Sequence, residues 1–298
     1  MGKQYPATLL EFERWFRSEA SCREYLERLR WPEGFRCPRC GHSKAWRTRR
    51  GLYHCAGCER GISVTVGTIF EDSRLPLRVW FRAAWAITNQ KSGVNALSLQ
   101  RLLGLGSYRT AWSCLQKFRR AMTRSGRDLL SGSVEVDEAY IGGVRRGSSS
   151  SLKKICVLVA AEIRGRGTGR IRLQKIPDHS ETSIKAGIRQ VVAVGSELVT
   201  DGAHAYKALV PHGYRLNRTV LEGKGRQASN VALPRVHLIT SLLKRWLLGT
   251  YHGRPSGPQL DHYLDEYTFR FNRRRSPQRG MLFWRLIQQS VAASSKRL

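Results

Sequence analysis

The chain contains 298 residues, 41% of them hydrophobic, and its 52 basic and 22 acidic residues give a formal net charge of +30. This length exceeds the usual size of one domain, and the apolar content is sufficient for hydrophobic cores, so a disordered tail is excluded and two or three folded units are expected. A chain this basic repels itself unless it lies against a polyanion. Nucleic acid is therefore the expected partner.

Arginine dominates the positive charge and occurs in clusters at 47–50, 118–120, 144–146 and 272–275. Its planar guanidinium group suits phosphate oxygens and base edges. An acidic membrane surface is the alternative partner, but the sequence shows no amphipathic or lipid anchor. It also shows no apolar run of the ~20 residues that a membrane span needs and no signal peptide. We therefore expect a cytoplasmic protein that binds no membrane.

The first segments in chain order are short helices followed by a cysteine-containing region. Apolar residues at helical spacing predict one or two helices within 8–30, which end at Pro32 and Gly34, so an N-terminal helical segment over 1–34 is expected. The next predicted domain, 35–72, ends in the sequence SVTVGTIF at 63–70, whose β-branched alternation predicts a strand.

Two CxxC pairs separated by 14 residues occur in the domain 35–72. In the cytoplasm thiols stay reduced, so paired cysteines favour metal binding over disulfides. This spacing brings four thiolates to the tips of two turns, which is the tetrahedral set that structural zinc prefers. The alternative is four unrelated buried cysteines. The predicted zinc ligands are Cys37, Cys40, Cys55 and Cys58.

The other cysteines are isolated along the chain, and we expect them to be small buried apolar residues: Cys22, Cys114 and Cys156. DNA contact by the cysteine-containing domain is expected from its neighbouring basic residues Arg47, Arg49 and Arg50.

The region 73–130 has helical periodicity. It predicts a helix through 79–87, a second through 96–103, a glycine turn and a third through 108–122. This order is typical of a helix-turn-helix, whose second helix enters the major groove. The alternative is a plain three-helix packing unit with a solvated basic face. On the helix-turn-helix interpretation, the DNA-binding residues are Arg109, Gln116 and Arg120.

The remaining chain, 131–298, alternates between strand and helix patterns and is expected to be one α/β domain with a mixed sheet. The polar, serine-rich segment 145–154 is predicted to be a mobile loop. The predicted strands are 134–141, 155–163, 170–176 and 197–201, and the predicted helices are 180–193, 236–249, 259–274 and 281–293.

Two aspartates fall on the predicted strands of this domain: Asp137 within the first and Asp201 at the end of the last. Carboxylates from neighbouring strands can converge on divalent metal and support two-metal phosphoryl transfer. The alternative is that both aspartates are ordinary strand-end or turn residues.

Several independent motifs resemble a known family over residues 10 to 290. They are CPRCG and CAGC, GTIF, TAW, VEVDEAYIGG, TDGAHAY, LLKRWLLGTYH and YLDEYTFRFNRR. Together they resemble the bacterial insertion-sequence transposases of the family numbered fifteen ninety-five. The resemblance implies an N-terminal zinc ribbon and a DDE-type catalytic domain of ribonuclease-H-like fold. It also implies strand cleavage and strand transfer at terminal inverted repeats with Mg2+ or Mn2+, by a nucleoid-associated protein that acts on double-stranded repeat and target DNA as at least a dimer.

Residue by residue, the resemblance makes Asp137 the first catalytic position and Asp201 the second. The third position, where the family commonly has Glu and sometimes Asn or His, is His237, and the family's downstream lysine is Lys244, expected to contact a DNA phosphate. On a helix these two residues share a face and lie roughly 10 Å apart. Three alternatives stay open: a working variant of the triad, a decayed site in a zinc-ribbon protein that only binds DNA, and a resolvase or repair nuclease.

Overall fold

The computed structural model describes residues 4–123, 126–142, 154–201, 203–218, 233–251 and 257–293. These residues form two compact units: residues up to 123 together with those from 275 onward make unit 1, and residues 126–274 make unit 2. The predicted catalytic domain over 131–298 includes residues 275–293, which instead pack in unit 1. Nearly all of the predicted mobile loop at 145–154 lies outside the described residues.

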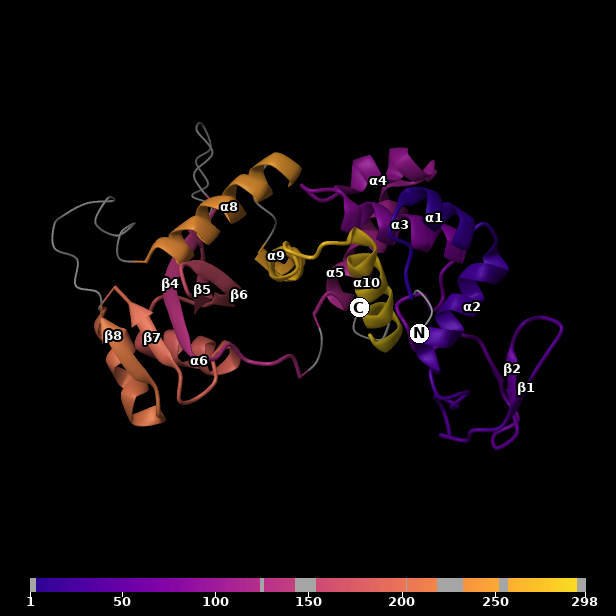
Figure 1. Ribbon diagram of the computed structural model, residues 1–298, viewed down its shortest axis with the longest axis horizontal. Coiled ribbons are helices and arrows are strands. Elements are labelled where there is room, and N and C mark those ends of the chain that lie inside the picture. Colours follow the sequence, from indigo (N-terminus) through magenta and orange to yellow (C-terminus); the bar gives the residue numbers. More distant parts are fainter. Residues whose placement is uncertain are drawn as a thin grey trace. The chain divides into compact units, whose positions relative to one another are not determined.

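Unit 1 is built on helices that share one aromatic core. The fully buried ring of Phe283 lies 5.4 Å from the ring of Phe12 and 5.8 Å from that of Phe81, so the C-terminal helix completes a core made by the start of the chain. Gly280 permits this approach, since an added Cβ would lie 1.6 Å from the carbonyl oxygen of Pro6. The helices, visible in Figure 1, are α1 (Leu9–Trp15), α2 (Glu19–Arg30), α3 (Leu77–Asn89), α4 (Ala96–Leu103), α5 (Tyr108–Ala121) and α10 (Arg279–Ala292).

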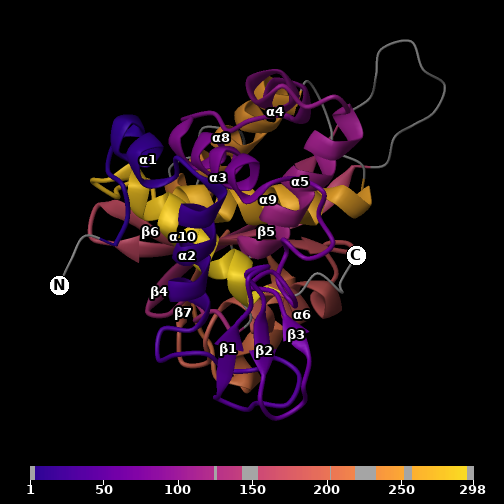
Figure 2. The same ribbon diagram turned by 90° about the vertical axis from the view of Figure 1, so that its right-hand side faces the viewer.

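A small antiparallel sheet in unit 1 carries the paired cysteines. It consists of β1 (Ala45–Arg47), β2 (Tyr53–Cys55) and β3 (Gly61–Ile62), seen side by side in Figure 2. The strand predicted at 63–70 is wrong, because these residues form turns after β3. Their hydroxyl groups bond locally, as when Thr68 Oγ1 donates to the Thr65 carbonyl at 2.6 Å, and such bonds compete with strand pairing.

Unit 2 contains a five-stranded mixed sheet in the order β6-β5-β4-β7-β8. The first three strands are antiparallel, whereas β7 and β8 run parallel to β4. This is the ribonuclease-H-like arrangement that the resemblance implied, so the predicted fold class is confirmed. The strands are β4 (Ser133–Ile141), β5 (Ile155–Arg164), β6 (Gly167–Ile176), β7 (Glu197–Thr200) and β8 (Arg215–Arg218).

Helices cover both faces of this sheet. Helices α8 (Pro234–Tyr251) and α9 (Gly257–Asn272) pack on one face, against alternate residues of β4, β5 and β6. On the other face lie α6 (Glu181–Val191) and the 3-10 helix η1 (His204–His212). Figure 1 shows α8 and α6 on opposite sides of β4 and β5.

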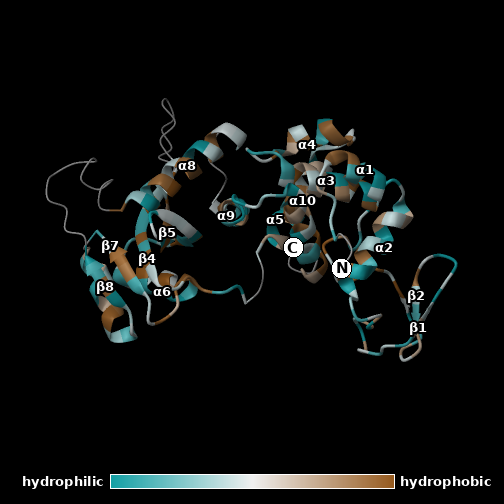
Figure 3. Ribbon diagram, in the orientation of Figure 1, coloured by the Kyte–Doolittle hydropathy of each residue, from teal (hydrophilic) through white to brown (hydrophobic). Residues whose placement is uncertain are grey.

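The sequence predicted neither η1 nor β8. The strand β8 has the polar sequence RLNR and forms an edge of the sheet, and Figure 3 shows it hydrophilic beside the hydrophobic β7. Charged residues on an edge discourage pairing with another chain, but they leave no apolar alternation to detect. The serine cap predicted for α6 is present, because Ser180 Oγ accepts a hydrogen bond from Ser183 N at 3.3 Å.

The arginine cluster at 272–275 contributes to the fold. Asn272 lies beside the edge strand β6, where its side chain accepts a hydrogen bond from Ile171 N at 2.7 Å and donates one to Ile171 O at 3.1 Å. The guanidinium groups of Arg273 and Arg274 lie over the rings of Phe269 and Phe271. In the described part of the chain, no helix has the length and apolar character needed to cross a membrane.

Candidate functional site

Asp137 lies within β4, and Asp201 lies at the end of β7, the neighbouring parallel strand. The register pairs Ser133 with Glu197 and Glu135 with Val199, so the strands β4 and β7 run side by side toward the two aspartates. Asp137 is the fifth residue of β4, and Asp201 directly follows the last residue of β7. The predicted placement of this pair on adjacent strands is therefore what the sheet shows.

His237 reaches the same place from α8. Its Nε2 atom lies 3.9 Å from Oδ2 of Asp137, and both side chains are partly exposed, at 28% and 24%. The start of α8 is fixed on β4 by the buried carboxylate of Glu135, which accepts hydrogen bonds from the backbone amides of Arg235 and Val236. The chemistry of these residues would not have drawn attention to Glu135 from sequence alone.

The surroundings of Asp137 have opposing effects on the pKa of its carboxyl group. Burial raises the pKa of its carboxyl group, and the neighbouring Asp201 raises it further, whereas the backbone amide of Glu138 and the imidazole of His237 lower it. A divalent cation would offset the repulsion between the two carboxylates. Two hard oxygen donors and one imidazole fit Mg2+ or Mn2+, with the imidazole favouring the softer ion.

The neighbouring Glu138 points to the opposite face of the sheet, because side chains alternate along β4. There Tyr206 donates a hydrogen bond to Glu138 Oε1 at 2.5 Å. Burial raises the pKa of the Glu138 carboxyl to about 7 against the effect of that hydrogen bond. Glu138 therefore supports η1 on the face that His237 does not occupy.

Lys244 is exposed on α8, seven residues after His237. The residues of this helix that face the sheet are buried and apolar, and Lys244 is not among them. Its ammonium group is therefore available to solvent on the helix that carries His237.

The four predicted thiols come together in the ribbon formed by β1, β2 and β3. All four sulfur atoms lie within 4.8 Å of one another. The Sγ atoms of Cys37 and Cys58 are 3.8 Å apart, and those of Cys40 and Cys55 are 3.6 Å apart. Four sulfurs bound tetrahedrally at ~2.3 Å from zinc are roughly 3.8 Å apart, so the thiols fit this ion. The isolated Cys22, Cys114 and Cys156 are buried, as predicted.

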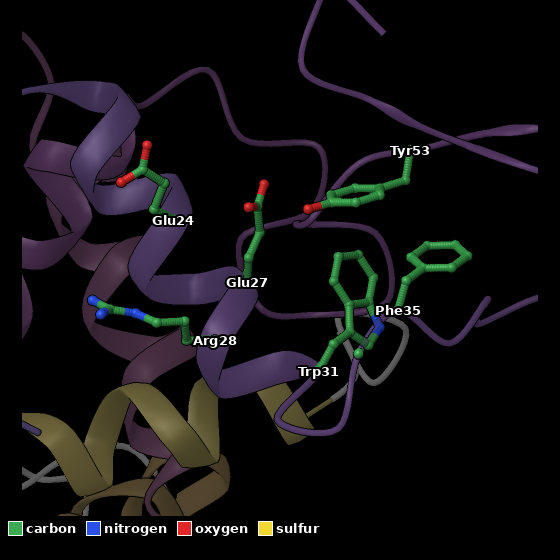
Figure 4. A pocket seen from close by; sticks show the side chains of 7 residues that line it. Glu24, Glu27, Arg28, Trp31, Phe35 and Tyr53 are labelled. Atoms are coloured by element: carbon green, nitrogen blue, oxygen red, sulfur yellow. The ribbon is translucent and has the colours of Figure 1, made fainter. Parts of the chain in front are cut away.

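A cavity of about 430 Å³ lies between the ribbon and α2, and its lining includes aromatic and acidic side chains. Figure 4 shows Trp31, Phe35 and Tyr53 gathered on one side, with Glu27 reaching from α2 toward the Tyr53 hydroxyl. Glu27 also lies 3.5 Å from the guanidinium group of Arg47. Neither the four thiols nor the site carboxylates Asp137 and Asp201 line this cavity. The contact of Glu27 with Arg47 holds the ribbon against α2.

The helices α4 and α5 pack against each other, with Gly104 in the left-handed conformation between them. This packing agrees with both the helix-turn-helix interpretation and the plain three-helix unit. The predicted DNA-facing residues are not alike. Arg109 is exposed and Arg120 is half-buried, but Gln116 is only 3% exposed. The prediction that Gln116 contacts DNA is therefore contradicted by its burial, since α5 is covered over more of its circumference than the apolar pattern suggested.

Comparison with known proteins matches both units. A family model described as an ISXO2-like transposase domain matches residues 129–272, and one described as a transposase zinc-ribbon domain matches residues 17–61. A curated protein of Halobacterium salinarum, described as an uncharacterized protein in transposable element ISH50, is 28% identical over 291 residues, which cover 90% of this chain and 95% of that protein. The ribbon and the α/β unit both match domains of one kind of transposase, so the resemblance of this chain to the IS1595 family of insertion-sequence transposases is confirmed.

Proposed function

We propose that this transposase cleaves and joins DNA strands at the terminal inverted repeats of an insertion sequence by metal-dependent phosphoryl transfer. The observation that carries the proposal is the position of His237, 3.9 Å from Asp137, beside a strand that leads to Asp201. Three potential metal ligands, from the middle of β4, the residue after β7 and the first turn of α8, thus lie near one another. A protein that only binds DNA requires no such arrangement.

In this proposal Asp137, Asp201 and His237 hold the catalytic Mg2+ or Mn2+. When bound, divalent metal supplies activation of a water or 3′ hydroxyl nucleophile and stabilisation of the leaving oxygen. Asp137 supplies a carboxylate whose ionised form is disfavoured by burial until a cation is near. His237 supplies a neutral nitrogen donor, and Lys244 contacts a phosphate beside the scissile bond.

The ribbon, with zinc held by its four cysteines, and the helices α4 and α5 bind the double-stranded repeat DNA. Arg109, Arg120 and the ribbon arginines provide the positive charge for phosphate contacts. Because the reaction brings two element ends together, the acting form contains at least two copies of the chain.

The test is a cleavage and strand-transfer assay on DNA that carries the element's terminal repeats, with Mg2+ or Mn2+. Asp137→Asn is expected to abolish both steps and to leave repeat binding unchanged. The matched control is Asp261→Asn, which removes a carboxylate of α9 that pairs with Lys175 at 2.7 Å, away from the site. Unchanged activity of Asp137→Asn would refute the proposal. A wild-type protein that binds repeats without cutting them would favour the decayed site.

A further inference from the structure

The N-terminus of α8, the helix that carries His237, lies on the side chain of Glu135 from β4. Glu135 is 1% exposed. Its Oε2 atom accepts hydrogen bonds from Arg235 N at 2.8 Å and Val236 N at 3.1 Å, and its Oε1 atom accepts one from Arg235 Nη1 at 2.6 Å. The carboxylate thus satisfies amides that a helix start leaves unpaired, and its charge opposes the positive end of the helix dipole.

Arg235 extends this contact to a second part of the sheet. Its Nε atom donates to the carbonyl oxygen of Gly167 at 3.0 Å, and its Nη2 atom donates to that of Gly165 at 2.9 Å. The Gly165 carbonyl belongs to the turn between β5 and β6, and the Gly167 carbonyl to the first residue of β6. The first turn of α8 is therefore tied by directional bonds to β4 and to the neighbouring hairpin.

The spacing of these contacts relates them to the candidate metal site. Glu135 and Asp137 are two residues apart on β4, so their side chains leave the same face of the sheet. On α8, Arg235 and Val236 directly precede His237. The hydrogen bonds that fix the start of the helix thus involve a residue two positions before Asp137 on β4 and the two residues directly before His237 on α8.

The rest of the α8 interface does not fix this geometry as tightly. Beyond its first turn, α8 meets the sheet through buried apolar side chains, among them Ile239, Leu243 and Leu247. Apolar burial is not directional, so it stabilises docking of the helix without setting its rotation or its height along β4. Two amides bonded to one carboxylate oxygen do set them.

We propose that Glu135 is a positioning residue that holds α8 in register on β4, so that His237 completes the metal site with Asp137 and Asp201. Glu135 itself does not bind the metal. This inference rests on the proposed function, because it concerns the same site. It predicts that loss of the carboxylate weakens divalent-metal binding through displacement of the third ligand.

The experiment measures Mn2+ affinity of the full-length, zinc-loaded protein by electron paramagnetic resonance titration. Supporting contacts of this kind change metal affinity about 10-fold to 100-fold, so Glu135→Ala is expected to raise the Mn2+ dissociation constant at least about 10-fold. Glu135→Gln keeps one acceptor oxygen and is expected to give a smaller rise. If Glu135→Ala does not fold, Glu135→Gln carries the test.

Hydrogen exchange supplies a second readout without metal. Exchange at the amides of Arg235 and Val236 is expected to accelerate in the Glu135 variants. The matched control is Glu162→Gln in β5. Glu162 is also buried, at 3% exposure, but its carboxylate pairs with Arg170 and not with the backbone amides of α8. Glu162→Gln should lower the melting temperature and leave unchanged both the Mn2+ affinity and the hydrogen-exchange rates of the α8 amides.

The inference is overturned if Glu135→Ala or Glu135→Gln lowers the melting temperature as Glu162→Gln does while Mn2+ affinity stays at the wild-type value. Asp137→Asn serves as the reference for the site itself. If Asp137→Asn also leaves Mn2+ affinity unchanged, the proposed function fails and the positioning role falls with it. Weaker binding in Asp137→Asn alone rejects only the role of Glu135.

Discussion

The Nε2 atom of His237 lies 3.9 Å from Oδ2 of Asp137, across the contact between α8 and β4. This distance is short enough for both atoms to share one metal ion and too long for a direct hydrogen bond. An imidazole at the third position supplies no negative charge and favours softer ions than Mg2+. Under the proposed function, the identity of this residue is therefore expected to set the metal preference of the site.

His237→Glu is expected to shift activity toward Mg2+, because a carboxylate adds a hard, charged oxygen donor. In strand-transfer assays the ratio of the Mn2+ rate to the Mg2+ rate should fall about 10-fold, while His237→Ala should lower both rates. Asp201→Asn is the control and should be inactive with either ion. Equal loss of both rates in His237→Glu would mean that the imidazole does something a carboxylate cannot.

Cys40→Ser is expected to release the zinc and unfold the ribbon, because binding of zinc by four thiolates supplies the folding free energy of such small domains. Metal analysis should find no bound zinc, and repeat-DNA affinity should fall at least about 10-fold. Cys22→Ala changes a buried cysteine outside the ribbon sheet and should retain one zinc per chain. Zinc retained by Cys40→Ser with unchanged DNA affinity would argue against this site.

Local periodicity predicted β4 to β7 and the helices α6, α8, α9 of unit 2, because these helices each pack an apolar face on the sheet and these strands contribute apolar residues to the cores on its two faces. It missed η1 and the polar edge strand β8. It also placed Asp137 within one strand and Asp201 at the end of another, and the pairing of these two strands brings the residues to neighbouring positions. It could not predict that Phe283 packs with Phe12, because the partners of an apolar helix face are chosen by long-range packing. Residues 63–70 show the reverse limit: their β-branched pattern is strand-like, but hydroxyl groups close turns instead.

Gln116 shows a further limit of helical patterns. A polar residue opposite an apolar face was expected to be exposed, yet it is buried, and neither polar atom of its side chain has a hydrogen-bond partner in the described structure. The pattern of one helix cannot show how many neighbours surround it. Glu135 was missed for a related reason, since its role depends on amides of a helix distant in the sequence.

Gln116→Met is expected to stabilise unit 1 by about 1 kcal/mol, because it replaces an unpaired buried amide with an apolar group of similar shape. Denaturant unfolding measures the change, and repeat-DNA affinity should not alter. Arg109→Ala is the comparison at an exposed position of α5 and should weaken DNA binding without changing stability. Loss of sequence-specific binding in Gln116→Met would restore Gln116 as a base-contacting residue.

Glu162 gives a prediction about pH. Burial raises the pKa of its carboxyl group, but hydrogen bonds from Arg170, the shortest at 2.6 Å, outweigh burial and hold the pKa below the ordinary 4.5. A lowered folded pKa contributes stability above the unfolded value and loses it as the pH falls through the folded pKa. The wild-type advantage over Glu162→Gln should be constant from about pH 8 to about pH 5 and shrink below that. An advantage that grows on acidification would contradict the pairing.

The ribbon carries the remaining prediction, which separates two kinds of DNA contact. Trp46 is 56% exposed and stacks on His54 with ring centroids 4.5 Å apart, next to a turn that contains the exposed Arg49 and Arg50. An exposed indole on a basic ribbon can stack on bases or sugars, whereas arginines at a hairpin tip contact phosphates.

Trp46→Ala should therefore weaken repeat binding by about 1 to 3 kcal/mol and leave its salt dependence unchanged. Arg49→Ala with Arg50→Ala should reduce the slope of log affinity against log salt by roughly 0.9 per lost contact. Fluorescence anisotropy over a range of salt concentrations measures both, and zinc content confirms that the ribbon is intact. The division between stacking and phosphate contact would be wrong if Trp46→Ala changed only the salt dependence of binding. It would also be wrong if the arginine variants changed the affinity and left its salt dependence unchanged.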